Sequence, residues 1–382
     1  MSRASSRRRT LIGAIVCAAV VGTAQPAVAS TVADDGRRHP AASHSSVHGV
    51  EKAVARSLAS SLARSDWRAR VRAATLATED ADLQALTEKA GSLAGKALPA
   101  SVAGANRRVA ALKGLPASTG SLLRVRLGAA SMRARLTPDV TPWVAVATSD
   151  EHAKTITAYD SRGRGHTVDA THVPAFPLYV LDIDAAKAHK AGLRVLREQL
   201  AGNGVSTPAP RGAQHAADTA GWWATKVTAV EVNDDQEPWF KGAAEMFSLV
   251  TGFGQDGKAR VDSVDMPYLD YDGTVYYPNQ ILVNWSNYKY NLADVVMMED
   301  DDGTNYKSLA QALTTALLTV TDQGTYIPLV NAVLSAMPDS WFTDDPDYVE
   351  SWYTLARNST GRLNGAAGNG WMTVEPYFVE QF

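Results

Sequence analysis

The 382-residue chain contains one cysteine, Cys17, and no long hydrophobic run. Cys17 lies in a short apolar stretch near the amino end, so the chain beyond that stretch has no thiol. This excludes disulfides, thiolate metal sites and a cysteine nucleophile from the remainder. A membrane-spanning helix needs about 20 predominantly apolar residues, and no segment meets that requirement.

Motifs of several enzyme classes are also absent. The chain has no H-E-x-x-H, no G-x-S-x-G and no phosphate-binding loop with its lysine. The last histidine is His215, so a Ser-His-Asp triad in the carboxy-terminal part would have to recruit His152, His166, His172 or His189. Surface positions are the simpler interpretation of these four histidines.

The amino end has the pattern of a signal peptide. Arg7, Arg8 and Arg9 precede an apolar stretch over 11–21, and Ala-Val-Ala ends at Ala29. We expect cleavage after Ala29, a signal peptide over 1–29 and an extracytoplasmic protein. Export of the unfolded chain is favoured, and the twin-arginine route is the alternative.

Charge divides the rest of the chain into two halves. Residues 30–220 have 25 basic and 17 acidic side chains, a net of 25 − 17 = +8. Residues 221–382 have 8 basic and 23 acidic side chains, a net of 8 − 23 = −15. The second half also has seven of the nine tryptophans. This contrast predicts two domains.

The basic half is predicted to be α+β. A polar leader is expected over 30–49, then an Ala-rich helical and mixed region over 50–200, and a linker over 201–220. Within it, 141–184 reads as a small β meander and 185–200 as a helix. Four arginines lie on the first helices: Arg64, Arg68, Arg70 and Arg72. Aromatic side chains that could stack on bases are scarce beside these arginines. We therefore interpret the arginines as a solvated helix face and expect no nucleic-acid binding.

The acidic half is predicted to be an antiparallel β-sandwich. The expected strands are 226–232, 245–251, 260–264, 281–285, 294–298, 349–356 and 371–379. Residues 306–337 interrupt them with apolar side chains at helical spacing, broken at 322–324. We expect this helical insertion to pack against the sandwich.

Three acidic clusters fall between the expected strands. Their candidate metal ligands are Asp234, Asp235, Glu237, Asp300, Asp301, Asp302, Asp345 and Asp347, with Glu245 as a weaker candidate. Clustered carboxylates repel one another unless a cation compensates, and Ca²⁺ takes six to eight oxygen ligands. Residues 300–305 do not fit an EF-hand loop, so a calcium site would need several loops. Turns and helix caps explain the same acids without metal.

Several long motifs resemble one known family. They are D-D-Q-E-P-W-F-K-G-A-A-E-M-F (234–247), M-P-Y-L-D-Y-D-G-T-V-Y-Y-P-N-Q (266–280), E-D-D-D-G-T-N-Y-K (299–307), D-D-P-D-Y-V-E-S-W-Y-T-L (344–355) and N-G-A-A-G-N-G-W-M-T-V-E-P-Y (364–377). The chain resembles, over about 222–380, a family of secreted bacterial proteins known only as a domain of unknown function, numbered three thousand one hundred and three. The resemblance implies export and brings no activity or catalytic residues. The acidic loops look like those of C2-like domains, which is an analogy of architecture.

Three functions follow from these patterns. The first is a noncatalytic exported binding or structural protein with a calcium-stabilised C2-like sandwich. The alternative is a secreted hydrolase with paired carboxylates acting on polysaccharide or peptide, in which tryptophans such as Trp222, Trp223, Trp239 and Trp285 stack on sugars. The third is docking of the basic half on anionic cell-envelope polymers or membrane.

Overall fold

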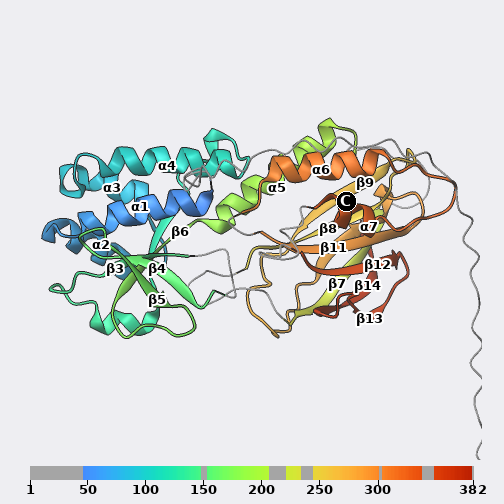
Figure 1. Cartoon of the computed structure of the whole chain (residues 1–382). Helices are drawn as coiled ribbons and strands as arrows, with labels where there is room; N and C mark the ends of the chain where they lie inside the picture. The colour runs from blue at the N-terminus through green and yellow to red at the C-terminus, as the bar shows by residue number, and fades with distance from the viewer. Residues whose placement is uncertain are drawn as a thin grey trace, which may run out of the picture. The chain divides into compact units, whose positions relative to one another are not determined.

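A computed structural model of the chain describes residues 46–147, 153–205, 221–233, 244–300, 303–337 and 348–380 (Figure 1). The expected signal peptide and most of the expected leader lie outside these ranges. Ala42–Phe382 form one compact unit. The fold is mixed α+β, as the sequence predicts, with amino-terminal helices followed by antiparallel sheets. No helix in the described ranges is both long and apolar enough to cross a membrane.

Four helices begin the described chain. They are α1 (Val47–Ser61), α2 (Ser65–Ala77), α3 (Leu83–Ala90) and α4 (Leu98–Leu112). The first helix begins at Val47, inside the range assigned to the leader, because the Ser46 hydroxyl accepts a hydrogen bond from the Gly49 amide. Its buried stripe includes Val54 and Leu58, which recur at helical spacing.

The helices pack against a six-stranded sheet in the order β1-β2-β6-β3-β4-β5. Its strands are β1 (Ala81–Asp82), β2 (Leu123–Leu127), β3 (Trp143–Val146), β4 (Thr155–Tyr159), β5 (Gly165–Asp169) and β6 (Leu178–Ile183). The last four strands are the predicted meander, although β3 and β6 pair in parallel. The strands β1 and β2 were not predicted from the sequence. The helix α5 (Ala185–Gly202) follows the sheet where a helix was expected.

Two four-stranded antiparallel sheets make up most of the acidic half. One has the order β10-β7-β14-β13 and the other β12-β11-β8-β9. Their strands are β7 (Gly221–Val232), β8 (Met246–Phe253), β9 (Ala259–Asp265), β10 (Gln280–Asn284), β11 (Leu292–Glu299), β12 (Tyr348–Ala356), β13 (Gly361–Asn364) and β14 (Gly370–Glu380). All seven predicted strands are present, and β13 is additional. Side chains from both sheets, such as Val230, Val295 and Met372, share one core cluster, so the sheets pack face to face.

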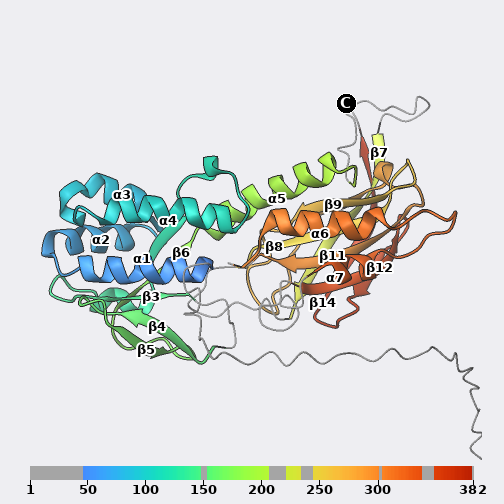
Figure 2. The ribbon, with the colours of Figure 1, turned by 45° about the horizontal axis from the view of Figure 1, so that its top comes forward.

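The sheet that contains β8 and β11 is buried on both faces. Phe247, Leu249 and Val296 point away from the other sheet and join a second core cluster, which continues into α5 and the amino-terminal helices. The predicted insertion forms α6 (Tyr306–Leu318) and α7 (Val330–Ala336), and α5 and α6 lie side by side over this sheet (Figure 2). Burial on both faces explains why every residue of β8 is apolar, small or hydroxylated.

The contact between α5 and α6 depends on one glycine. A methyl group built on Gly192 would lie 2.0 Å from Cε2 of the buried Tyr306 ring. We therefore predict that Gly192→Ala lowers the free energy of unfolding by about 1–3 kcal/mol through overpacking. Gly202→Ala, at the end of the same helix with no atom within 4 Å, is the matched control and should be neutral or stabilising. Thermal melting of both variants checks this, and equal melting temperatures would contradict it.

Candidate functional site

A buried polar cluster joins three distant parts of the chain. Lys113 follows the last residue of α4, His189 lies on α5, and Asp300 directly follows β11. Tyr306, the first residue of α6, completes the cluster. All four side chains are almost fully buried. The surface position expected for His189 is therefore wrong, because α5 is enclosed by α6 and the sheet.

The cluster is a chain of hydrogen bonds and ion pairs. Lys113 Nζ lies 3.3 Å from Asp300 Oδ1, and His189 Nδ1 lies 3.6 Å from Asp300 Oδ2. The same His189 nitrogen lies 3.0 Å from the Tyr306 hydroxyl. On the other side of the ring, His189 Nε2 lies 3.3 Å from Oδ1 of Asp265, the half-exposed residue that ends β9. Asp265 is thus where the chain of polar groups reaches the surface.

Electrostatics keeps this cluster ionised. Burial by itself would lower the pKa of His189, but its hydrogen bonds to Asp265 and Asp300 raise that pKa to about 8. Burial would raise the pKa of Asp300, yet Lys113, His189 and Tyr306 hold that pKa below its ordinary value. Each charge therefore faces an opposite charge, which makes burial of the cluster tolerable. The groups that could perform acid-base chemistry are used to join α4, α5 and β11.

Of the predicted metal ligands, only Glu245 and Asp300 fall in the described ranges. Asp234, Asp235, Glu237, Asp301, Asp302, Asp345 and Asp347 lie outside them. Asp300 is engaged by Lys113 and His189, and its amide donates to the Glu245 carbonyl at 3.0 Å. In the described residues, no group of three His, Cys, Asp or Glu side chains is placed to hold a metal ion.

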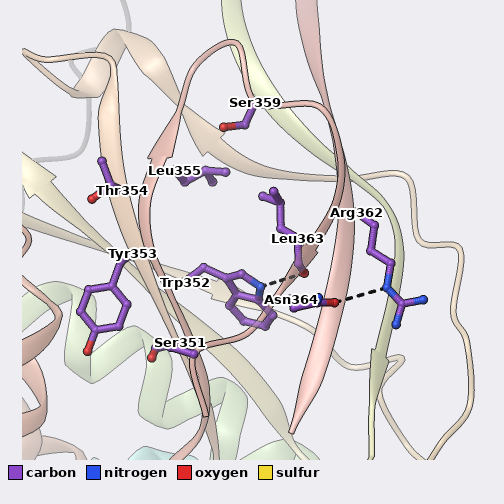
Figure 3. A pocket seen from close by; sticks show the side chains of 10 residues that line it. Ser351, Trp352, Tyr353, Thr354, Leu355, Ser359, Arg362, Leu363 and Asn364 are labelled. Carbon is purple, nitrogen blue, oxygen red and sulfur yellow. Dashed lines mark hydrogen bonds between the residues drawn. The ribbon is translucent and has the colours of Figure 1, made fainter. Parts of the chain in front are cut away.

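An accessible hollow lies at one open edge of the two sheets. It is a groove of about 400 Å³ between β12 and β13, the edge strands of the two sheets (Figure 3). Its lining residues are Ser351, Trp352, Tyr353, Thr354, Leu355, Ser359, Arg362, Leu363, Asn364 and Ala366. They supply an apolar floor, hydroxyl groups, one amide and one guanidinium group. None is a carboxylate or a histidine.

The β12 side of this groove is shaped by a buried carboxylate. Asp294 on β11 accepts hydrogen bonds from the Thr354 amide at 2.7 Å and the Leu329 amide at 2.5 Å. The pairing of β11 with β12 is irregular here, and Thr354 has φ +55°, which is unusual for a β-branched residue. The bulge leaves the Thr354 and Tyr353 side chains exposed at the groove. Figure 3 shows Trp352 and Leu355 between the two strands, toward Leu363 and Asn364, whereas Tyr353 and Thr354 lie on the other side of β12.

The β13 side is held by a second buried carboxylate. Glu350 accepts hydrogen bonds from four main-chain amides, those of Ser351, Ala367, Asn369 and Gly370, at 2.7–3.1 Å. The last three amides belong to the N-G-A-A-G-N-G turn that connects β13 to β14. Glycine and asparagine are typical of turns, whereas nothing in the sequence pairs this turn with Glu350.

Arg362 is the one charged residue lining the groove. Its guanidinium carbon lies 4.0 Å from the centre of the Trp371 ring, and its Nε donates to Asn364 Oδ1 at 3.4 Å. Stacking fixes the plane of the guanidinium group while leaving its edge accessible. Both walls of the groove are thus ordered by contacts within the protein.

A second groove, of about 520 Å³, lies beside the end of α6 and contains two carboxylates, Asp256 and Asp322. Asp322 accepts hydrogen bonds from Lys289 and Tyr290, and these lower its pKa to about 2. It therefore stays ionised near neutral pH and cannot serve there as a general acid. Asp322 therefore cannot supply the protonated carboxyl group that glycoside hydrolysis requires near neutral pH.

These features define a mixed α+β protein in which the helical module shares one core with a sheet that packs, on its other face, against a second antiparallel sheet. The chain belongs to the family described as "Protein of unknown function (DUF3103)", which matches residues 52–382. The match extends the resemblance stated above for 222–380 to nearly the whole chain. No curated protein and no solved structure matches it.

The raised pKa of His189 makes stability depend on pH. Since the folded-state pKa of about 8 exceeds the ordinary 6.5, the contribution of His189 is complete below about pH 6.5 and lost as the pH rises through 8. We predict that the free energy of unfolding falls by on the order of 2 kcal/mol over this interval. Denaturant titrations at several pH values would measure the loss.

Two histidine variants test whether His189 causes this pH dependence of stability. His189→Gln should flatten the pH dependence between 6.5 and 8, whereas His172→Gln, at a well exposed side chain, should preserve it. His48 acts in a different interval, because burial lowers its pKa to about 4 and its effect is confined to acid pH. The account would be contradicted if the free energy of unfolding changed with pH between 6.5 and 8 as much in the His189 variant as in the parent protein.

Proposed function

We propose that this is an exported, noncatalytic binding protein and that the groove between β12 and β13 is its ligand site. The observation that carries this proposal is the contrast between the two kinds of polar site. Lys113, His189 and Asp300 are enclosed and paired, whereas the accessible groove offers hydroxyl, amide, guanidinium and aromatic groups without a general acid or base.

The groove chemistry favours an uncharged, hydroxyl-rich ligand such as a saccharide. Hydroxyl groups of Thr354 and Ser359 and the amide of Asn364 can exchange hydrogen bonds with sugar hydroxyls, and the leucine floor suits the apolar face of a pyranose ring. The surrounding half of the chain has a net charge of −15, which disfavours polyanions at this site. The hydrolase alternative needs two accessible acids with separated pKa values, and the groove lining has none.

A binding test can use a variant that keeps the fold. Thr354→Gly removes a hydroxyl and a methyl group from the groove and relieves the positive φ, so folding should be preserved. Against a panel of neutral polysaccharides (amylose, cellulose, chitin and mannan), we predict retention of the parent protein and roughly tenfold weaker binding of this variant. The control is Thr360→Ala, at an exposed threonine in the connection between β12 and β13 that does not line the groove.

The same assay separates binding from hydrolysis. Release of reducing ends from a retained polysaccharide would establish the hydrolase alternative and reject the noncatalytic proposal. If none of the panel retains the parent protein, the saccharide assignment of the groove is wrong.

We further propose that the two facing sheets form a C2-like sandwich stabilised by Ca²⁺ bound to the acidic clusters. Support comes from the described residues that flank the clusters. Met246 pairs with Glu299 and Met298 pairs with Tyr348, which places the beginnings of β8 and β12 beside the end of β11. Val232, at the end of β7, pairs with Gly370, whose amide donates to Glu350 near the start of β12. The three acid-rich segments thus start or end at the same end of the sandwich.

Calcium dependence can be measured by melting the protein with Ca²⁺ and with chelator. We predict a higher melting temperature with Ca²⁺, because binding to the folded state alone stabilises it by mass action. Asp302→Asn combined with Asp345→Asn should abolish the difference, whereas Asp139→Asn, at an exposed position in the basic half, should retain it. Identical melting curves with Ca²⁺ and chelator in the parent protein would refute the calcium proposal.

A further inference from the structure

Four arginines gather where α2 meets the short 3₁₀ helix η3 (Ala130–Arg135). Arg72 Nε donates to the Leu136 carbonyl at 2.6 Å, and Arg133 donates in the opposite direction to the Leu76 carbonyl at 3.0 Å. Arg68 lies one helical turn before Arg72, and Arg135 lies two residues after Arg133. We call Arg68, Arg72, Arg133 and Arg135 the arginine face.

The charge of the arginine face is not balanced by carboxylates. Within the described residues, none of its four guanidinium groups forms an ion pair, and their hydrogen bonds go to main-chain carbonyls. Helix carboxy-terminal carbonyls compensate only part of a positive charge. By contrast, Arg124 in the nearby sheet pairs with both Asp82 and Asp184. The arginine face therefore presents positioned cations with unused N–H groups.

Exposed apolar side chains lie directly beside these cations. Arg135 Nη1 donates to the Ala175 carbonyl at 2.8 Å, within the loop that connects β5 to β6. That loop carries Val173, 43% exposed, and Phe176, 39% exposed. Across the described part of residues 46–205 these are the two large hydrophobic side chains that are exposed. Phe176 is positioned by an edge contact with Trp143, at 4.8 Å between ring centroids.

We propose that the arginine face and the Val173–Phe176 loop dock the protein on an anionic phospholipid surface. A soluble polyanion would use the cations but has no use for the two apolar side chains. A lipid interface uses both, because phosphate groups pair with guanidinium and the region beneath the headgroups accepts valine and phenylalanine. The proposal is independent of the groove and of calcium, since none of its residues belongs to the acidic half.

The test is flotation of the exported chain (residues 30–382) with vesicles of phosphatidylglycerol and phosphatidylcholine, compared with phosphatidylcholine alone. The parent protein should float with the anionic vesicles at low salt and dissociate at high salt. Arg133→Gln combined with Arg135→Gln should lower partitioning by about 25-fold, roughly 5-fold for each cation. The control is Arg107→Gln combined with Arg194→Gln, which removes the same charge from exposed positions elsewhere and should have a much smaller effect.

A second variant distinguishes binding to a lipid surface from binding to a soluble polyanion. Val173→Ser combined with Phe176→Ser should weaken flotation while leaving retention on immobilised inorganic polyphosphate unchanged. Circular dichroism and melting curves verify that each variant is folded, and Arg133→Lys with Arg135→Lys should still float if charge is what matters. Flotation that both the glutamine and the serine variants leave unchanged would overturn the proposal. So would retention of the parent protein on polyphosphate without binding to anionic vesicles.

Discussion

Burial of one sheet on both faces is the constraint on which the rest of this structure depends. The sheet β12-β11-β8-β9 packs against the second sheet on one side and against α5 and α6 on the other. The end of β11 is consequently enclosed, and a polar group there needs a partner. Asp300, at the end of β11, meets this requirement with Lys113 and His189, which come from the basic half. The two halves of the chain are joined by charge as well as by apolar contact.

This arrangement gives the buried reactive side chains a structural role. A histidine beside two carboxylates and a buried lysine would ordinarily suggest catalysis. Here every one of those groups faces an opposite charge. Glu350 and Asp294 are used in a similar way, because they order the turn and the bulge that shape the edge groove. In our proposal, ligand recognition uses the groove that Glu350 and Asp294 shape.

The sequence was informative wherever a pattern is local. Alternation predicted the seven long strands, and apolar spacing predicted α5 and the two-part insertion, because strand and helix periodicity depend on neighbouring residues. The strand β2 was missed because its alternate Arg124 and Arg126 made L-R-V-R-L too polar to stand out. The short β13 follows a turn and has one apolar residue, Leu363, so it has no recognisable pattern.

The site residues were harder to predict because their partners are distant in sequence. Asp300 was predicted as a metal ligand, and its observed partners, Lys113 and His189, are 187 and 111 residues away in the sequence. His189 had no local signal that distinguishes a buried histidine from an exposed one on an amphipathic helix. The groove residues include Trp352, which alternation assigned to a strand interior, and no spacing rule joins β12 to β13 across an open edge.

The most direct test of the junction is a double-mutant cycle on Lys113 and Asp300. Lys113→Met and Asp300→Leu should each lower the free energy of unfolding, by up to about 3–5 kcal/mol, because each takes from a buried charge one of the opposite charges that face it. The double variant should recover much of that loss, since both charges are then gone. Additive losses in the double variant would show that the two side chains act independently and would contradict the account of how the halves are joined.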